Sequence, residues 1–70
     1  MNKIEVMDIN GNILSCEVIK FIENKELNRV YVVYKDNNDI LVSRLIKENN
    51  NYQIIPVEDN EWDYIEKNLD

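Results

Sequence analysis

Apolar and polar residues alternate along most of the chain, and their spacing predicts five strands followed by one helix. Alternation with a period of two is typical of a strand that buries one face. The interruptions between the apolar runs are rich in asparagine and aspartate, which favour turns. We therefore expect strands over residues 3–8, 13–23, 29–35, 40–47 and 52–57, and a helix over residues 61–69.

The first two strands are expected to form an antiparallel hairpin. Residues Asp8–Gly11 are its expected turn, because the pair Asn-Gly favours a type I′ loop. Along the second strand the apolar residues change face between Val18 and Ile19, which predicts a bulge or a strong bend. The third strand, residues 29–35, is apolar on both faces, so we expect it to be covered on both sides or partly exposed at an interface.

The predicted helix has one apolar stripe. Trp62, Ile65 and Leu69 fall at positions i, i+3 and i+7, a spacing that places them on one face. Asp59 or Asn60 is suited to be the N-cap, since a short polar side chain can accept a hydrogen bond from a free amide of the first turn. Packing this stripe on the concave face of the sheet would bury Trp62 and close the core.

These elements predict an α+β fold for residues 1–70 as a single domain. The expected architecture is a curled antiparallel five-stranded β-meander with one C-terminal α-helix packed on one face. The alternative is a small SH3-like or OB-like β-barrel plus the helix, because a strongly bent second strand is also how small barrels close.

The negative charge is concentrated at the end of the chain. The formal net charge is −6. Residues 58–70 carry six acids against Lys67, a balance of −5, which leaves −1 for residues 1–57. Binding to a nucleic-acid backbone needs Lys or Arg to displace counterions. Direct nucleic-acid binding is therefore not expected. We expect instead that the acidic residues form a surface that binds another protein.

The composition also excludes several kinds of site. There is no histidine and a single cysteine, Cys16, so a zinc site or a Cys-His nucleophile pair cannot form within this chain. Cys16 lies within an apolar alternation and is expected to be a buried structural thiol. We expect no catalytic residue, cofactor or metal, and hence no enzyme. A lone cysteine favours a location in the reducing cytoplasm. We see neither a leader nor an apolar run of roughly 18 residues, so a membrane location is not expected.

The leading functional hypothesis is a non-enzymatic protein-interaction module. Its binding surface would be the acidic side of the helix, with Glu61, Asp63 and Glu66, or an exposed strand edge. The alternative is an acidic nucleic-acid mimic that inhibits a DNA- or RNA-binding protein. Mimicry needs acids spaced like phosphates over a broad face, whereas these acids are confined mainly to one short helix.

The aromatic residues divide into two expected groups. Phe21, Tyr31 and Trp62 are expected in the core, while Tyr34 and Tyr52 are candidates for an exposed pair on a protein-binding surface. The third strand, residues 29–35, is also a candidate for a homodimer interface.

One segment resembles a known family. Residues 54–62, Ile-Ile-Pro-Val-Glu-Asp-Asn-Glu-Trp, follow the pattern apolar-x-Pro-apolar-x-Asp-x-Glu-aromatic near the end of the YrzB-like proteins, domain of unknown function 1292. Gly11 after a short strand, Phe21 at the end of the second strand, and Tyr31 with the two valines that follow it extend the similarity over nearly the whole chain. The resemblance implies a small cytoplasmic bacterial protein and brings no agreed activity, cofactor or catalytic residue.

Overall fold

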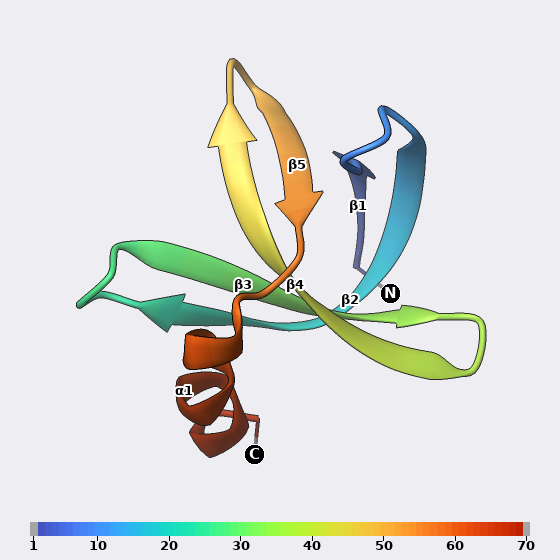
Figure 1. Cartoon of the computed structure of the whole chain (residues 1–70). Coiled ribbons are helices and arrows are strands. Elements are labelled where there is room, and N and C mark those ends of the chain that lie inside the picture. The colour runs from blue at the N-terminus through green and yellow to red at the C-terminus, as the bar shows by residue number, and fades with distance from the viewer. Residues whose placement is uncertain (1, 70) are drawn as a thin grey trace.

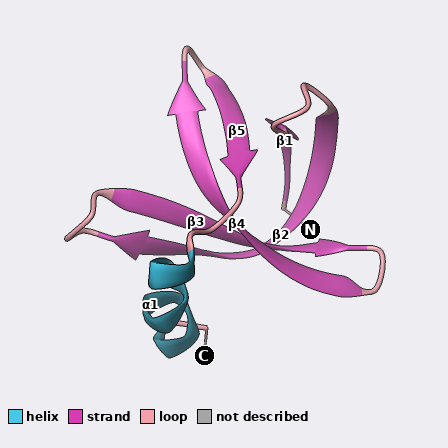
Figure 2. Cartoon of the chain, viewed as in Figure 1, coloured by secondary structure: helices cyan, strands magenta, loops and turns pink. Residues whose placement is uncertain are grey.

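The computed structural model describes residues 2–69 and contains five strands, a single 3₁₀ turn and one short helix within them (Figures 1 and 2). Each predicted strand is found, with ends shifted by at most two residues. The elements in chain order are β1 (Lys3–Met7), β2 (Ile13–Asn24), β3 (Arg29–Asp36), β4 (Asp39–Glu48), β5 (Asn51–Ile55), η1 (Asp59–Glu61) and α1 (Trp62–Lys67).

The five strands form a closed barrel. Strands that follow one another in sequence pair antiparallel, and β1 meets β5 in a parallel contact through the single register pair Met7↔Gln53. A small barrel with one C-terminal helix, the alternative left open by the sequence, therefore describes this fold. The curled meander that was the first expectation is closed into this barrel by the contact between its first and last strands.

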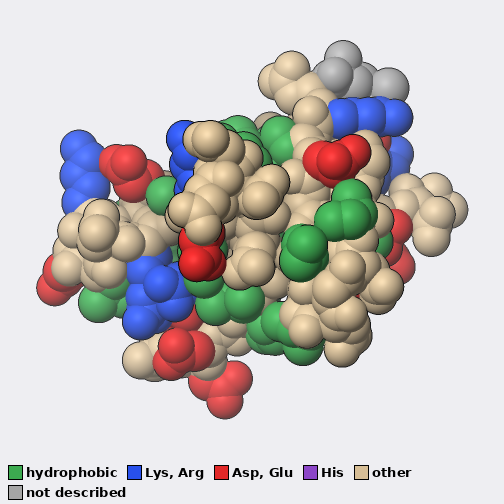
Figure 3. All heavy atoms as spheres, turned by 90° about the horizontal axis from the view of Figure 1, so that it is seen from above, with side chains coloured by type: hydrophobic (Ala, Val, Ile, Leu, Met, Phe, Trp, Pro, Cys, Tyr) green, Lys and Arg blue, Asp and Glu red, His purple; other side chains and the backbone are tan. Residues whose placement is uncertain are grey.

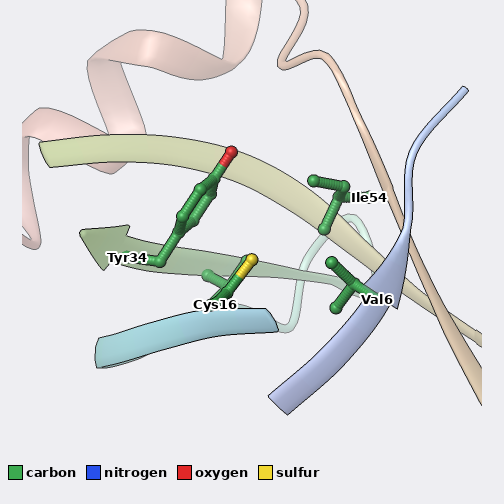
Figure 4. Close-up of a cluster of buried hydrophobic side chains, with 5 residues drawn as sticks. Val6, Cys16, Tyr34 and Ile54 are labelled. Atoms are coloured by element: carbon green, nitrogen blue, oxygen red, sulfur yellow. The ribbon is translucent and has the colours of Figure 1, made fainter. Parts of the chain in front are cut away.

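Buried side chains form two clusters, one on each face of β3. Val32 and Tyr34 lie in the barrel-interior cluster, with Val6, Cys16 and Ile54 converging on them from β1, β2 and β5 (Figure 4). The second cluster lies on the opposite face of β3. It contains Ile22, Tyr31, Val33 and Ile65. The expectation that β3 is covered on both sides is thus confirmed, as is the burial of Cys16.

A bulge in β2 reconciles its two apolar phases. The register with β3 runs through Val18↔Tyr34, shifts, and resumes at Lys20↔Val33, as the change of face at Ile19 predicts. β1 pairs with β2 only from Ile13 to Glu17, so the second half of β2 has no strand on its β1 side. Phe21 lies in that half and is 51% exposed, so the expectation that it packs in the core is wrong.

The turn between β1 and β2 differs from the expected type I′ loop. Met7 pairs with Ile13, which leaves a five-residue connection, and within it only Gly11 has a positive φ, +83°. The Asp8 carboxylate organises this loop by accepting hydrogen bonds from the backbone N–H groups of Asn10 and Asn12, both at 2.9 Å. These bonds, the one to Asn12 foremost, lower the pKa of Asp8.

Asparagine supplies all the remaining positive φ angles of the described residues. Asn28, Asn37, Asn49 and Asn50 have φ between 50° and 70°, each in a connection between strands. Asparagine tolerates this left-handed region better than most residues. The chain therefore turns several times although it contains a single glycine.

The helix buries a different face from the one expected. Glu61 and Ile65 are buried, and Tyr64 and Asn68 are half-buried, whereas Trp62 is 36% exposed and Leu69 is also exposed. The buried face is thus turned by about one residue step from the predicted stripe. Neither Asp59 nor Asn60 is the N-cap: the N-cap of α1 is Glu61, and the 3₁₀ turn before it begins at Glu58, whose carbonyl accepts from the Glu61 N–H at 3.0 Å.

Candidate functional site

A buried carboxylate, Glu61, connects the helix to the sheet. The Glu61 side chain is fully buried, yet its oxygens accept from three donors, two on β3 and one in the segment before η1. Arg29 Nη1, at the start of β3, lies 3.0 Å from Oε2, and the Tyr31 hydroxyl donates to the same oxygen. The backbone N–H of Glu58 donates to Oε1 at 3.0 Å.

These contacts keep the Glu61 carboxylate charged. Burial alone would raise its pKa, but the hydrogen bonds from Tyr31, the Glu58 backbone and Arg29 outweigh burial, so the pKa is lowered. The pKa of Arg29 is raised, chiefly by its hydrogen bond to Glu61. Burial, followed by the bond to Glu61, raises the pKa of Tyr31. Because each shift fixes the charge state held at neutral pH, the network is suited to holding structure rather than to moving a proton.

The expectation that Glu61 forms part of an exposed acidic surface is therefore wrong. Glu61 is buried because the basic side chain of Arg29, which is only 25% exposed, needs a carboxylate beside it. Asp63 and Glu66 remain exposed on the opposite side of the helix. Glu58, at the start of the turn, is exposed and lies 3.7 Å from the same guanidinium.

The exposed side of the helix combines acids with one aromatic residue. We call Asp59, Trp62, Asp63 and Glu66 the outer helix face. Relative to Asp59, the other three residues fall at i+3, i+4 and i+7, which places the four side chains on one side of the helical segment. Trp62, which the sequence places in the core, is instead the large apolar group of this exposed surface.

The two tyrosines proposed as an exposed pair are not one. Tyr34 is buried in the barrel-interior cluster, and its hydroxyl lies 3.0 Å from Ser43 Oγ. Tyr52 is half-buried and packs against the same cluster. β3 is likewise unsuited to form a homodimer, because Tyr31 to Tyr34 are buried and both its edges are paired.

Two surface hollows flank the contact between β1 and β5. The larger, of about 320 Å³, is predominantly apolar and lies at the ends of β3 and β5. It is lined by Asp8, Ile9, Tyr34, Leu41, Val42, Ser43, Ile54, Ile55 and Pro56. The smaller, of about 210 Å³, includes Tyr52 and residues from β1. Tyr34 and Tyr52 therefore contribute to separate hollows.

Some of these features left a signal in the sequence. A glutamate three residues after an N-cap is the pattern of a capping box, and Glu58 with Glu61 fits that spacing. Arg29 and Tyr31 share one face of a strand, which places a cation and a hydroxyl side by side. The apolar hollow left no such signal, since its lining comes from four separate segments.

The remaining surface has mixed character. Viewed from above, hydrophobic side chains show between acidic and basic ones, and neither sign of charge forms one continuous patch (Figure 3). Within residues 2–69, no three acidic or cysteine side chains come together in a way that could hold a metal ion. No helix in this part of the chain has the length and apolar character needed to cross a membrane.

Comparisons with known proteins relate the chain to an uncharacterised group. The family model described as "Protein of unknown function (DUF1292)" matches residues 10–70. The UPF0473 protein YrzB of Bacillus subtilis (strain 168) is 37% identical over 76 residues, which cover 94% of this chain and 82% of that protein. No solved structure matches.

Proposed function

The chain belongs to the DUF1292 family of proteins of unknown function, and from this premise we propose that it is a small, non-enzymatic protein-interaction module. The observation that carries the proposal is the exposure of Trp62 among the acids of the outer helix face. Tryptophan is enriched at protein interfaces because its large ring buries much area at little cost in side-chain entropy.

The charges around Trp62 indicate the kind of partner segment that this surface would bind. Asp59, Asp63 and Glu66 are all exposed, and Lys67 is the only basic residue of the helix. A partner segment with Lys or Arg next to an apolar side chain would complement this surface. The acids would steer the approach, and the ring would supply the buried contact.

Nucleic-acid mimicry is less well supported than protein binding. The burial of Glu61 removes one acid from the surface on which mimicry would depend. The exposed acids that remain on the helix flank an aromatic ring, which has no counterpart in a row of phosphates.

The test is affinity capture from a native host, using the purified protein and two matched charge-reversal variants. Asp63→Lys with Glu66→Lys changes the outer helix face, and Glu5→Lys with Glu26→Lys makes the same change in net charge at exposed positions elsewhere. We expect the wild type and the Glu5/Glu26 variant to capture the same partner, and the Asp63/Glu66 variant to lose it.

A substitution of Trp62 alone separates the contribution of the aromatic ring to binding from that of the acidic side chains. Trp62→Ser should weaken binding of the captured partner by at least about tenfold, because central aromatic residues carry most of the energy of an interface. Equal capture by the wild type and the Asp63/Glu66 variant would disprove binding by this surface. Failure of the wild type to retain any specific partner would count against the module itself.

A further inference from the structure

One edge of the barrel sheet is free along half a strand. β4 pairs with β3 from Asp39 to Leu45, but it pairs with β5 only from Arg44 to Glu48. The segment Asp39–Ser43, called here the β4 edge, therefore has a neighbouring strand on one side only. In an antiparallel pair, alternate residues direct their N–H and C=O groups away from the partner strand, so this edge presents backbone donors and acceptors.

The corresponding edge on β2 is covered, which sets the β4 edge apart. Beyond its bulge β2 pairs with β3 alone, but the C-terminal segment lies over that side. The Tyr64 hydroxyl donates to the Glu23 carbonyl at 2.7 Å, and Lys20 Nζ donates to the Asn68 carbonyl. Proteins commonly protect an edge strand with a covering element or with lysines. No lysine lies along Asp39–Ser43, and Ile40 is 66% exposed there.

An apolar hollow lies directly beside this edge. Leu41, Val42 and Ser43 form one wall of the 320 Å³ hollow, and the loop residues Asp8 and Ile9 contribute to its lining. Its size is at the lower end of the roughly 300–1,000 Å³ of ligand pockets, enough for aliphatic side chains of a bound strand. A strand that pairs with the edge would place alternate side chains toward the hollow.

The charge around the hollow is acidic. Asp8 lines it, and Asp36 and Asp39 flank the turn that begins the β4 edge, against Lys35 on the neighbouring strand and Arg44 directly after the edge, a balance of −1. The carboxylate of Asp8 is held by backbone amides on its own loop, so it stays in place at the rim. This balance favours an occupant with lysine or arginine near its aliphatic residues.

We propose that the β4 edge and its hollow bind an extended segment of a partner protein, which adds a strand to the sheet, inserts aliphatic side chains and sets basic residues against the acidic rim. Main-chain hydrogen bonds supply affinity and the side-chain hollow supplies specificity, as in other cases of strand addition. This site does not involve the outer helix face, so either surface could bind without the other.

The test uses a defined peptide and nuclear magnetic resonance of the whole isotope-labelled protein. The probe is a capped heptapeptide of alternating lysine and valine. We expect its titration to shift backbone amides of Asp39–Ser43 together with those of Asp8, Ile9 and Ile55. N-methylation of its valine amides should weaken binding by at least about tenfold, since it removes the main-chain donors. The glutamate-valine analogue should bind at least tenfold more weakly through repulsion at the rim.

A matched pair of leucines provides the control on the protein. Leu41 lines the hollow, and Leu27, in the β2–β3 turn, has similar exposure. Leu41→Lys should reduce peptide affinity by at least about tenfold, and Leu27→Lys should leave it unchanged. The proposal is overturned by equal binding of the N-methylated peptide, by shifts confined to Asp63 and Glu66, or by no binding at millimolar peptide. It is also overturned if the same amides shift on concentrating the protein alone, because a second copy would then be the occupant.

Discussion

The two buried clusters on either side of β3 are held together by different interactions. The barrel interior contains apolar side chains around Val32, with the Tyr34 hydroxyl bonded to Ser43 at its margin. The helix-side cluster packs Ile65 on the opposite face of the same strand, but it adjoins the buried ion pair of Glu61 with Arg29. Hydrophobic burial is non-directional, whereas a carboxylate between two donors fixes an orientation. This difference explains why the alternation of apolar and polar residues predicts the strands of the barrel but does not predict which face of the helix is buried.

We infer that the buried ion pair selects the orientation of the helix more than it adds stability. Desolvating two charges costs several kcal/mol in general, and good hydrogen bonds offset that cost. In this protein three donors converge on Glu61, and Arg29 remains partly exposed, which reduces its own desolvation. Rotating the helix to bury Trp62 would move Glu61 away from Arg29 and Tyr31. We infer that this loss outweighs the gain from burying the ring.

The strongest way to separate the two clusters is to create a cavity in each. Ile65→Ala on the helix side should lower the free energy of unfolding by about 4 kcal/mol, and Ile54→Ala in the barrel by about 3 kcal/mol, since truncating a buried isoleucine costs about 2–5 kcal/mol. Urea denaturation followed by circular dichroism and by Trp62 fluorescence measures both. Because β3 is shared, the two signals should have one midpoint in each variant. A lower fluorescence midpoint alone in Ile65→Ala would show that the helix unfolds independently.

The next variant removes the charge of the Glu61 side chain and keeps its shape. Glu61→Gln should lower the free energy of unfolding by about 3 kcal/mol, because Arg29 loses its buried carboxylate. Tyr31→Phe removes a donor to the same oxygen, so the double variant should lose less than the sum of the single losses. Chemical denaturation of the four proteins measures this coupling. Strict additivity would contradict the role given to the network.

The barrel and the helix differ in how much the sequence could predict. The alternation of Tyr31 and Val33 with Val32 and Tyr34 correctly indicated a strand covered on both faces, and the phase change at Ile19 correctly located the bulge. The exposure of Phe21 could not be foreseen, because it depends on how far the pairing with β1 extends along β2, and that pairing stops at Glu17. The burial of Glu61 depends on Arg29, 32 positions earlier in the chain. Hydrophobic periodicity contains no information on such a pairing, so it favoured Trp62.

The charge of the network also gives the helix-side cluster a pH dependence. The pKa of Glu61 in the folded protein lies below its ordinary value of 4.5, so below that value the unfolded chain takes up this proton more readily than the folded protein. Its contribution to stability is therefore present above about pH 4.5 and is lost as pH falls through the lower folded pKa. Urea midpoints of wild type and Glu61→Gln should differ most near neutral pH and converge in acid. A difference that stays constant with pH would exclude Glu61 as the group responsible.

The smallest expected effect concerns the acids that the sequence grouped with Glu61. Asp63→Asn and Glu66→Gln should each change the free energy of unfolding by no more than about 0.5 kcal/mol, as is usual for surface substitutions without buried partners. Thermal or urea denaturation beside Glu61→Gln measures the contrast directly, with the same loss of one charge in each protein. A loss at Asp63 or Glu66 as large as that at Glu61 would mean that these acids also support the fold. With stability unchanged, any effect of the same variants on partner binding can be assigned to the outer helix face itself.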